Sequence, residues 1–323
     1  MLTPTLNLQG QDLNAKKAGM KHAVEALADR VLSGSDDVFA DFLRLDRLLY
    51  HYSLTNTCLI ICQAPEARRV SSMARFDKLA KGQGHKATKG PRDKYPSAVA
   101  PKKGSRAIWI WVPCPFSKDV DKGDGTSEKV SGLFFKPGPV WTVEDLYFRD
   151  TGEDCAADPN FLPDFVQDHG GKAGEYHEVL KEWAEGEGIK VEVVAASRLG
   201  GAAGVSYGGR IAERMGDTAG KRFSVLVHEV AHEVLHKKDE RQSLSKTVRE
   251  CEAEAVCGVV CEYFGFAQAD LSAAYLRNHG ATRQDVLASM DRIHKTATLI
   301  IDAVEKGEVA EAEAEREAVV VSG

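Results

Sequence analysis

The chain has few aromatic residues and few cysteines, and it contains no long apolar run. Without a stretch of 18 or more uncharged apolar residues, we expect no membrane-spanning helix. The N-terminal segment lacks a charged region followed by an apolar one, so we expect no signal peptide and a cytoplasmic location. Seven cysteines, an odd number with no CxxC pair, argue against a disulfide framework and against a cysteine zinc site. We expect them to be mainly buried core residues in a reducing compartment.

Charge is distributed unevenly along the chain. The formal net charge is −6, yet the window 66–106 holds twelve Lys and Arg against three acidic residues, a net charge of +9. The remaining residues therefore carry −15. Such asymmetry indicates an anionic partner for one region only. The alternative is that the window is a solvated basic loop.

The length and a hydrophobic content of 43% are sufficient for two globular domains. In the first half, apolar residues at helical spacing predict three helices. Alternating β-branched and aromatic residues predict the two strands of a hairpin. Glycines and prolines are expected to break the basic window into loops. The expected helices cover 14–32, 39–52 and 53–65, and the expected strands cover 106–113 and 132–143.

The second half begins after a segment whose Asp, Gly and Pro content is typical of a linker. The elements expected after it are a helix over 175–187, a strand in 189–196, a short strand near 204–211, a helix around residue 230 and a helix over 243–264. The acidic end is expected to be a frayed helix or a disordered tail. The fold class is therefore α+β with two domains. The expected boundaries are 1–148 for a basic domain, 149–174 for the linker, 175–300 for a second domain and 301–323 for the tail.

The sequence HEVAH at 228–232 has the spacing of a metal site on a helix. His228 and His232 lie four residues apart, so one helical face directs both imidazoles towards a single point. Glu229 lies beside them, where it can deprotonate a bound water. Zinc in catalytic sites takes three protein ligands and keeps one open position. Manganese or another divalent ion also fits two histidines and a carboxylate.

The third ligand is expected from the next helix. His236 extends the same face but lies eight residues from His228, about 12 Å along a helix. One ion with bonds of about 2 Å cannot span that distance, so His236 is expected to be a supporting or structural residue. In the segment RECEAEAVCG, Glu250 and Glu254 share one helical face and Glu252 is turned away. The alternative for this segment is a solvated charged face.

These motifs resemble a known family. The segments LVHEVAHEVLH, RECEAEAVCGVVCEYFG and GVSYGGRI are similar to the metallopeptidase domain of ArdC-like antirestriction proteins, and to the broader ImmA/IrrE group of zinc peptidases. The resemblance implies a gluzincin-like C-terminal domain. It also implies that Glu250 is the third ligand, with Glu254 as a partner that orients a histidine.

The N-terminal half resembles the single-stranded-DNA-binding domain of the same family through YHYSLTNTCLIICQAPEARRV and APKKGSRAIWIWVP. Thr55 departs from the family's usual glycine, and GHKATKGPRDKYPSAV is an apparent insertion. Cationic side chains would neutralise phosphates, and aromatic rings would stack on unpaired bases. Trp109 and Trp111 are two apart on a strand and share one face, which either stacks on bases or packs as core. The candidate DNA contacts are Arg68, Arg69, Arg75, Lys78, Lys102, Lys103, Arg106, Trp109 and Trp111.

The leading hypothesis is a zinc metallopeptidase-type protein that binds single-stranded DNA. It resembles antirestriction factors of plasmids, phages or other mobile elements. Glu229 would act as general base, with a protein or peptide as substrate. Tyr207, His236 and Tyr275 are candidates for stabilising the oxyanion, and the strand near 204–211 is a candidate edge for pairing with substrate. The alternatives are a DNA-binding protein with a structural, non-hydrolytic metal site, or a regulatory protease that cleaves a repressor.

Overall fold

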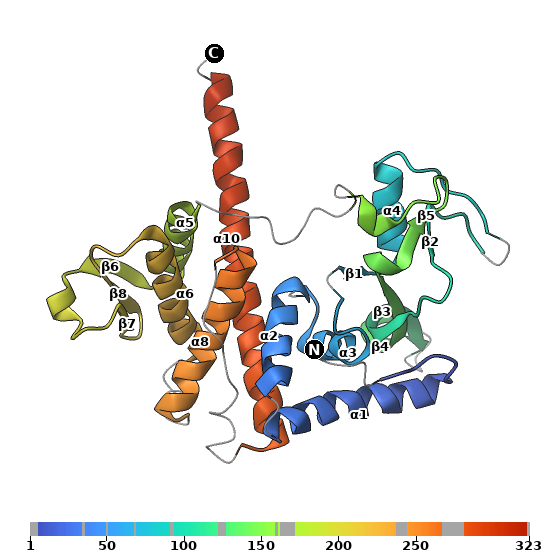
Figure 1. Ribbon diagram of the computed structural model, residues 1–323, viewed down its shortest axis with the longest axis horizontal. Coiled ribbons are helices and arrows are strands. Elements are labelled where there is room, and N and C mark those ends of the chain that lie inside the picture. Colours follow the sequence, from blue (N-terminus) through green and yellow to red (C-terminus); the bar gives the residue numbers. More distant parts are fainter. Residues whose placement is uncertain are drawn as a thin grey trace. The chain divides into compact units, whose positions relative to one another are not determined.

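The computed structural model describes residues 6–33, 36–49, 51–67, 69–90, 94–121, 127–158, 161, 172–236, 244–266 and 281–321 (Figure 1). The chain divides into two compact units. Unit 1 comprises Met1–Leu27 and Thr55–Pro163, and unit 2 comprises Ala28–Leu54 and Asp164–Gly323. Both units contain helices and strands, in agreement with the expected α+β class. No helix among the described residues is long and apolar enough to cross a bilayer.

The unit boundaries differ from the predicted ones at two places. The helix α2 (Asp36–Leu49) belongs to unit 2, because it packs on α8 (Lys246–Tyr263) and because its Asp46 bonds His294 in the interior at 2.6 Å. The segment that follows residue 148 belongs to the core of unit 1, where Cys155 and Phe161 are buried. The part of the expected linker from 162 to 171 lies outside the described residues.

Unit 1 is built around the predicted hairpin. Strands β3 (Ile108–Asp121) and β4 (Ser127–Thr142) pair antiparallel with Ile108 opposite Val140, and β1 (Val70–Ser71) adds to the far edge of β4. A second, two-stranded sheet pairs β2 (Val99–Pro101) with β5 (Leu146–Phe148). The described parts of both hairpin strands continue into the segment expected to be a polar loop.

The edge of β3 that does not pair with β4 is covered by side chains of α3 (Leu54–Gln63). The amide of Asn56 both donates to and accepts from the backbone of Trp111, at 2.9 and 2.8 Å. Gln63 does the same with Trp109 at 2.9 Å. These amides replace the missing neighbouring strand and satisfy backbone groups that an open edge leaves unpaired. Helix α1 (Leu13–Leu32), predicted from periodicity, supplies Lys16, whose Nζ lies 3.9 Å from the centre of the Trp109 ring.

The basic window contains a helix, α4 (Met73–Gly82), where the sequence predicted loops. Ser72 caps its first turn by accepting a hydrogen bond from the Arg75 amide. The apolar side of the helix buries Phe76 and Ala80 in the core of unit 1. Burial of this side in the core therefore stabilises the helix more than the flanking glycines and prolines destabilise it.

Asp77 of α4 ties this helix to the segment before β2. Its carboxylate accepts hydrogen bonds from Lys81 Nζ, the Ala98 amide and Ser97 Oγ, at 2.6, 2.6 and 3.2 Å. Burial alone raises the pKa of Asp77, but these hydrogen bonds outweigh it and hold the pKa below its ordinary value of 3.8. The carboxylate therefore stabilises the fold fully above pH 3.8, and that stabilisation is lost as the pH falls through the lower folded-state pKa.

We predict that Asp77→Asn lowers the local stability of α4 at pH 7 by about 1–3 kcal/mol, because charge-assisted hydrogen bonds become neutral ones. Hydrogen exchange of α4 amides, measured by mass spectrometry at pH 7 and at pH 3, reports this change. The difference from wild type is expected to shrink at the lower pH. The exposed Glu66→Gln serves as control. An Asp77→Asn protein with wild-type protection at pH 7 contradicts the prediction.

Unit 2 is a group of helices with a small sheet against α6 (Ala219–Leu235) (Figure 1). The sheet has the order β6-β8-β7, with β6 (Lys190–Val194) parallel and β7 (Gly204–Ser206) antiparallel to β8 (Arg210–Arg214). Strand β7 therefore lies at the edge. Helix α6 packs on α5 (Ala173–Gly186), α8 and α10 (Arg283–Val321).

Helix α10 continues to Val321 and includes most of the acidic end, 301–323, which was expected to be either a frayed helix or a disordered tail. The run of Ala and Glu in this end has high helix propensity. Its N-terminal part buries Ile293, Ile300 and Ile301 in unit 2, so the helix is already formed when it reaches the acidic end.

Candidate metal centre

Helices α6 and α8 each begin at a capped residue and bury an apolar side. Thr218 accepts from the Lys221 amide at the start of α6, and Ser245 accepts from the Val248 amide at the start of α8. The two helices pack against each other. This packing brings His228, Glu229 and His232 of α6 towards the glutamates of α8.

Three ligand atoms converge between the two helices. His228 Nε2 and His232 Nε2 are 3.1 Å apart, and Glu250 Oε2 lies 3.7 Å from the first and 3.4 Å from the second. Tetrahedral ligands at zinc distances of about 2.0–2.1 Å are about 3.3 Å from one another. The three atoms thus form the triangle that one small divalent ion requires. Among the described residues, no other group of His, Cys, Asp or Glu has this geometry.

The other nitrogen of each histidine has its own partner. His228 Nδ1 lies 3.2 Å from Glu254 Oε2, and His232 Nδ1 lies 3.2 Å from His236 Nδ1. Burial alone lowers the pKa of His228, but Glu254 and Glu229 outweigh it and the pKa is raised. Burial and the neighbouring His228 lower the pKa of His232 to about 4, which keeps this imidazole neutral, as a ligand must be.

Glu229 is 7% exposed and lies beside the three ligands. Burial raises its pKa to about 7, while the neighbouring His228 opposes this shift. Its side chain packs closely on Gly204 of β7, where an added Cβ would meet Glu229 Cγ at 2.9 Å. Any larger residue at 204 would therefore push either the strand or the carboxylate away. Glu229 is thus held between the edge strand and the ligands.

The segment GVSYGGRI, expected as one short strand, is a hairpin of β7 and β8. Gly208 and Gly209 form its two-residue turn, and both have positive φ (80° and 88°), which strongly favours glycine. Glu233 of α6 accepts hydrogen bonds from both glycine amides, at 2.8 and 2.7 Å, and from Ser206 Oγ at 2.6 Å. Helix α6 thereby positions the edge strand. The Gly-Gly pair between two β-patterned segments is the sequence signal that indicates this turn.

A buried polar chain lies behind His232; the sequence interpretation expected His236 to be a supporting or structural residue but missed the residues beyond it. His236, 2% exposed, also lies 3.3 Å from Glu252 Oε2. Glu252 is fully buried; it accepts from Ser289 Oγ at 2.7 Å and forms an ion pair with Arg292 of α10. Burial raises the pKa of Glu252, but hydrogen bonds from His236, Arg292 and Ser289 outweigh it and lower the pKa. Glu252 does turn away from the ligands, as expected from its helical position, but it is not solvated. It supports His232 through His236.

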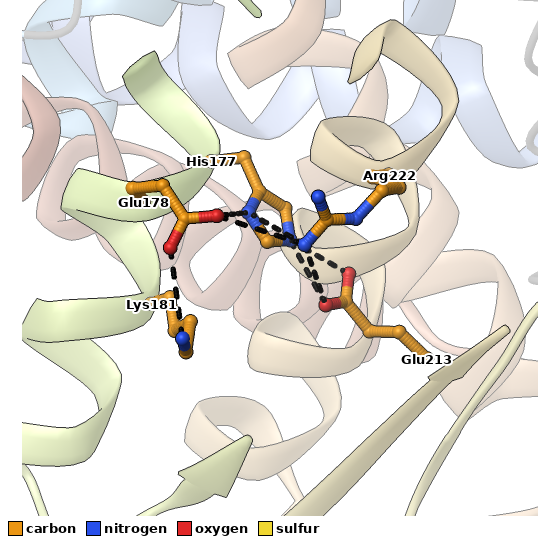
Figure 2. A network of polar contacts seen from close by, with 5 residues as sticks. All are labelled: His177, Glu178, Lys181, Glu213 and Arg222. Atoms are coloured by element: carbon orange, nitrogen blue, oxygen red, sulfur yellow. Dashed lines mark hydrogen bonds and ion pairs between the residues drawn. The ribbon is translucent and has the colours of Figure 1, made fainter. Parts of the chain in front are cut away.

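A second buried polar cluster holds the start of α6 (Figure 2). His177 of α5 lies 2.9 Å from Glu213 of β8 through Nε2 and 3.1 Å from Glu178 through Nδ1. The guanidinium of Arg222 in α6 reaches the same imidazole at 3.2 Å and Glu213 at 3.8 Å. His177 and Glu213 are each 1% exposed, so both are paired in the interior. The cluster joins α5, β8 and α6 one and a half turns before His228.

The remaining predicted residues are placed as follows. Arg68 and Tyr275 lie outside the described residues. Tyr207 is 47% exposed on the hairpin turn, with the Arg210 guanidinium 4.3 Å from the centre of its ring, and His236 is buried and lines the cavity beside the ligands. Their role in stabilising an oxyanion stays a prediction. Trp109 and Trp111 are half-buried on the face of β3 opposite the buried Ile108 and Ile110. Lys102 bonds Asp154 and is half-buried, Arg69 is half-buried, and four further candidates are exposed: Arg75, Lys78, Lys103 and Arg106.

No profile of a known protein family matches the chain. An uncharacterized protein of Bacillus anthracis, pXO2-81, is 25% identical over 334 aligned positions, which cover 93% of this chain. They cover 54% of that protein, so the chain spans about half the length of this relative.

Two crystal structures of the antirestriction ArdC protein from plasmid R388 are similar to the chain. The metal-free structure has a TM-score of 0.48 at 15% identity and covers 88% of this chain and 98% of its own. The Mn(II)-bound structure has a TM-score of 0.46 at 12% identity, and the match covers 87% of this chain and 97% of the ArdC chain. These neighbours bear the ArdC name that the sequence motifs suggested. The likeness to the ImmA/IrrE group stays a prediction.

Proposed function

We propose that the chain is a metal-dependent peptidase with a unit that binds single-stranded DNA, of the antirestriction type found on mobile elements. The observation that carries the peptidase is the convergence of His228, His232 and Glu250 within 4.8 Å. The buried Glu229 lies beside them. A purely structural site has no need of a second, buried carboxylate next to its three ligands. Zinc suits this donor set, and manganese or another divalent ion is the alternative.

A divalent ion held there would lower the pKa of a water molecule and polarise a peptide carbonyl. Glu229 is placed to accept the proton of the attacking water, hold it on a carboxylate oxygen and deliver it to the leaving amine. Glu254 and His236 orient the two imidazoles through their Nδ1 atoms, so that Nε2 of each faces the centre.

The cavity at this site extends along the edge strand. It has a volume of about 350 Å³, and its lining includes Gly204, Val205 and Ser206 of β7 together with Glu229 and His232. An extended peptide could add to the edge of β7 by backbone hydrogen bonds and pass directly over the ligands. A second cavity of about 250 Å³ shares Gly204 and Glu229 and continues past His228. Substrate on β7 would therefore cross from one cavity to the other at Glu229.

The peptidase is tested by hydrolysis of a defined peptide mixture with the full chain, first stripped with a chelator and then reloaded with zinc or manganese. We expect cleavage that disappears on stripping and returns on reloading, with products mapped by mass spectrometry. A chain that holds one equivalent of metal and cleaves none of the peptides contradicts the proposal.

Unit 1 is proposed to bind DNA through its exposed cations. Lys103 and Arg106 precede β3, are exposed and form no ion pair in the described part of the chain. The half-buried Trp109 and Trp111 follow them in the chain, on β3 itself. Cations next to aromatic rings match the composition of single-strand binding surfaces.

We predict that the full chain binds single-stranded DNA with a steep salt dependence. Removing both Lys103 and Arg106 by alanine substitution is expected to reduce the slope of log K against log salt by about 0.7 for each phosphate that these two side chains neutralise. Fluorescence anisotropy with a labelled oligonucleotide measures both slopes. The control is Lys295→Ala, which removes an exposed positive charge from unit 2 instead of unit 1. Identical slopes for wild type and the double variant would remove these two residues from the interface.

A further inference from the structure

The metal-site cavity has two basic residues that the proposed chemistry does not use. Lys246 and Arg249, from the first turn of α8, line it together with Glu229, His232 and Glu250. Neither forms an ion pair with an acidic side chain in the part of the chain that the structure describes. By contrast, the neighbouring Glu250 and Glu254 of the same helix both face the histidines.

Arg249 in particular has an unsatisfied polar atom. Its Nε is buried and has no hydrogen-bond partner in the part of the chain that the structure describes. Buried polar atoms in native proteins are almost always hydrogen-bonded, so an exception needs an explanation. A guanidinium presents its donors in a planar fork that matches the two oxygens of a carboxylate. A carboxylate bound in the cavity that Arg249 lines would meet this fork.

The two cavities that meet at Glu229 differ in how their charged residues are paired. In the second cavity, Glu254 Oε2 lies 3.2 Å from His228 Nδ1, and Lys221 also lines the cavity. In the first cavity, Glu250 belongs to the metal triangle and Glu229 is beside it, and among the described residues no ion pair joins either carboxylate to Lys246 or Arg249. Lys246 and Arg249 therefore line the first cavity only, on one side of Glu229.

We infer that Lys246 and Arg249 form a subsite for a carboxylate of the peptide substrate, close to the bond that is cut. This carboxylate belongs either to an acidic side chain or to the C-terminus of the peptide. The inference rests on the proposed peptidase function, because it assigns a substrate class to the same site. A cavity of about 350 Å³ lies at the small end of ligand cavities and suits one or two residues rather than a large group.

Binding tests the subsite independently of turnover. The probe is the zinc-loaded, full-length Glu229→Gln protein with labelled ten-residue peptides, in which one Glu is moved along a Gln background. Each peptide is made with a free and with an amidated C-terminus. We expect one Glu position, or the free C-terminus, to bind about 10- to 100-fold more tightly than its neutral counterpart. The position that gives the effect identifies which source of carboxylate the subsite takes.

Adding Arg249→Gln to the Glu229→Gln protein is expected to bring this affinity ratio close to one. Adding the exposed Lys295→Gln instead is expected to leave the ratio unchanged. A ratio of one already in the Glu229→Gln protein overturns the subsite. So does tighter binding of a phosphorylated peptide or a short oligonucleotide, which would assign the pair to phosphate.

Turnover of the same peptides by the wild-type chain separates the two proposals. Preferential binding without any cleavage contradicts the peptidase and leaves the subsite standing. Cleavage that ignores the charge of the peptide, together with a binding ratio of one, leaves the peptidase and contradicts the subsite.

Discussion

Glu229→Gln is expected to lower kcat for peptide hydrolysis by about 10²–10⁴-fold in the metal-loaded protein. Glutamine keeps the size of the side chain and its packing on Gly204, but it cannot accept a proton from water. Because Glu229 is not one of the three convergent ligands, the metal content is expected to stay at the wild-type level. The loss should therefore appear in kcat more than in KM.

The control for this variant is Glu185→Gln, an exposed carboxylate on α5 that faces no part of the site. Initial rates on the best peptide, measured at equal metal content, compare the two proteins with wild type. Residual activity of Glu229→Gln within about threefold of wild type would show that another group takes the proton, and the general-base role would then be withdrawn.

Glu252→Ala is expected to have the largest effect on stability. Its carboxylate is fully buried and bonds His236, Ser289 and Arg292, so alanine leaves the buried His236 and Ser289 and the part-exposed Arg292 without this partner. Each buried hydrogen-bonding group left unpaired costs about 1–3 kcal/mol. Chemical denaturation of the full chain, followed by the fluorescence of Trp183 in unit 2, measures the loss.

The same substitution is also expected to weaken metal binding by about 10- to 100-fold, since His236 loses the carboxylate that fixes its orientation towards His232. Competition against a chelator, under conditions where the variant is folded, measures this affinity. Ser289→Ala is the milder companion, because it removes a single hydrogen bond to the Glu252 carboxylate, worth about 1.5–3 kcal/mol, and keeps the Arg292 pair. If Glu252→Ala and Ser289→Ala bind metal equally well, the polar chain behind His232 is structural only.

Elements with a strong periodic pattern could be predicted from the sequence. Helices over 13–32 and 54–63 begin and end close to the expected residues, and the hairpin strands share their expected cores at Ile108–Pro113 and Gly132–Thr142. In these segments the local pattern and the tertiary burial favour the same structure. The helix α4 was missed because the surrounding glycines and prolines indicate loops, whereas the burial of Phe76 and Ala80 in the core depends on tertiary packing.

The candidate site likewise contains residues that a local motif identifies and residues that only tertiary packing brings together. The spacing of His228, Glu229 and His232 is local, so the motif alone identifies them. Glu252, Ser289 and Arg292 come together only when α8 packs on α10, and a charged residue that is buried by such packing resembles any solvated one in the sequence. The place of α2 in unit 2 has the same cause, since the partner of Asp46 is His294, 248 residues further along the chain.

Metal content of the purified full chain tests the central claim most directly. Elemental analysis would compare wild type with His228→Ala, Glu229→Gln and Glu250→Ala, each confirmed as folded by circular dichroism. We predict about one equivalent of zinc or another divalent ion in wild type and in Glu229→Gln, and loss of the metal in the other two. Retention of metal by Glu250→Ala would show that another group supplies the third ligand. A wild-type chain that binds no divalent ion would contradict the metal centre itself.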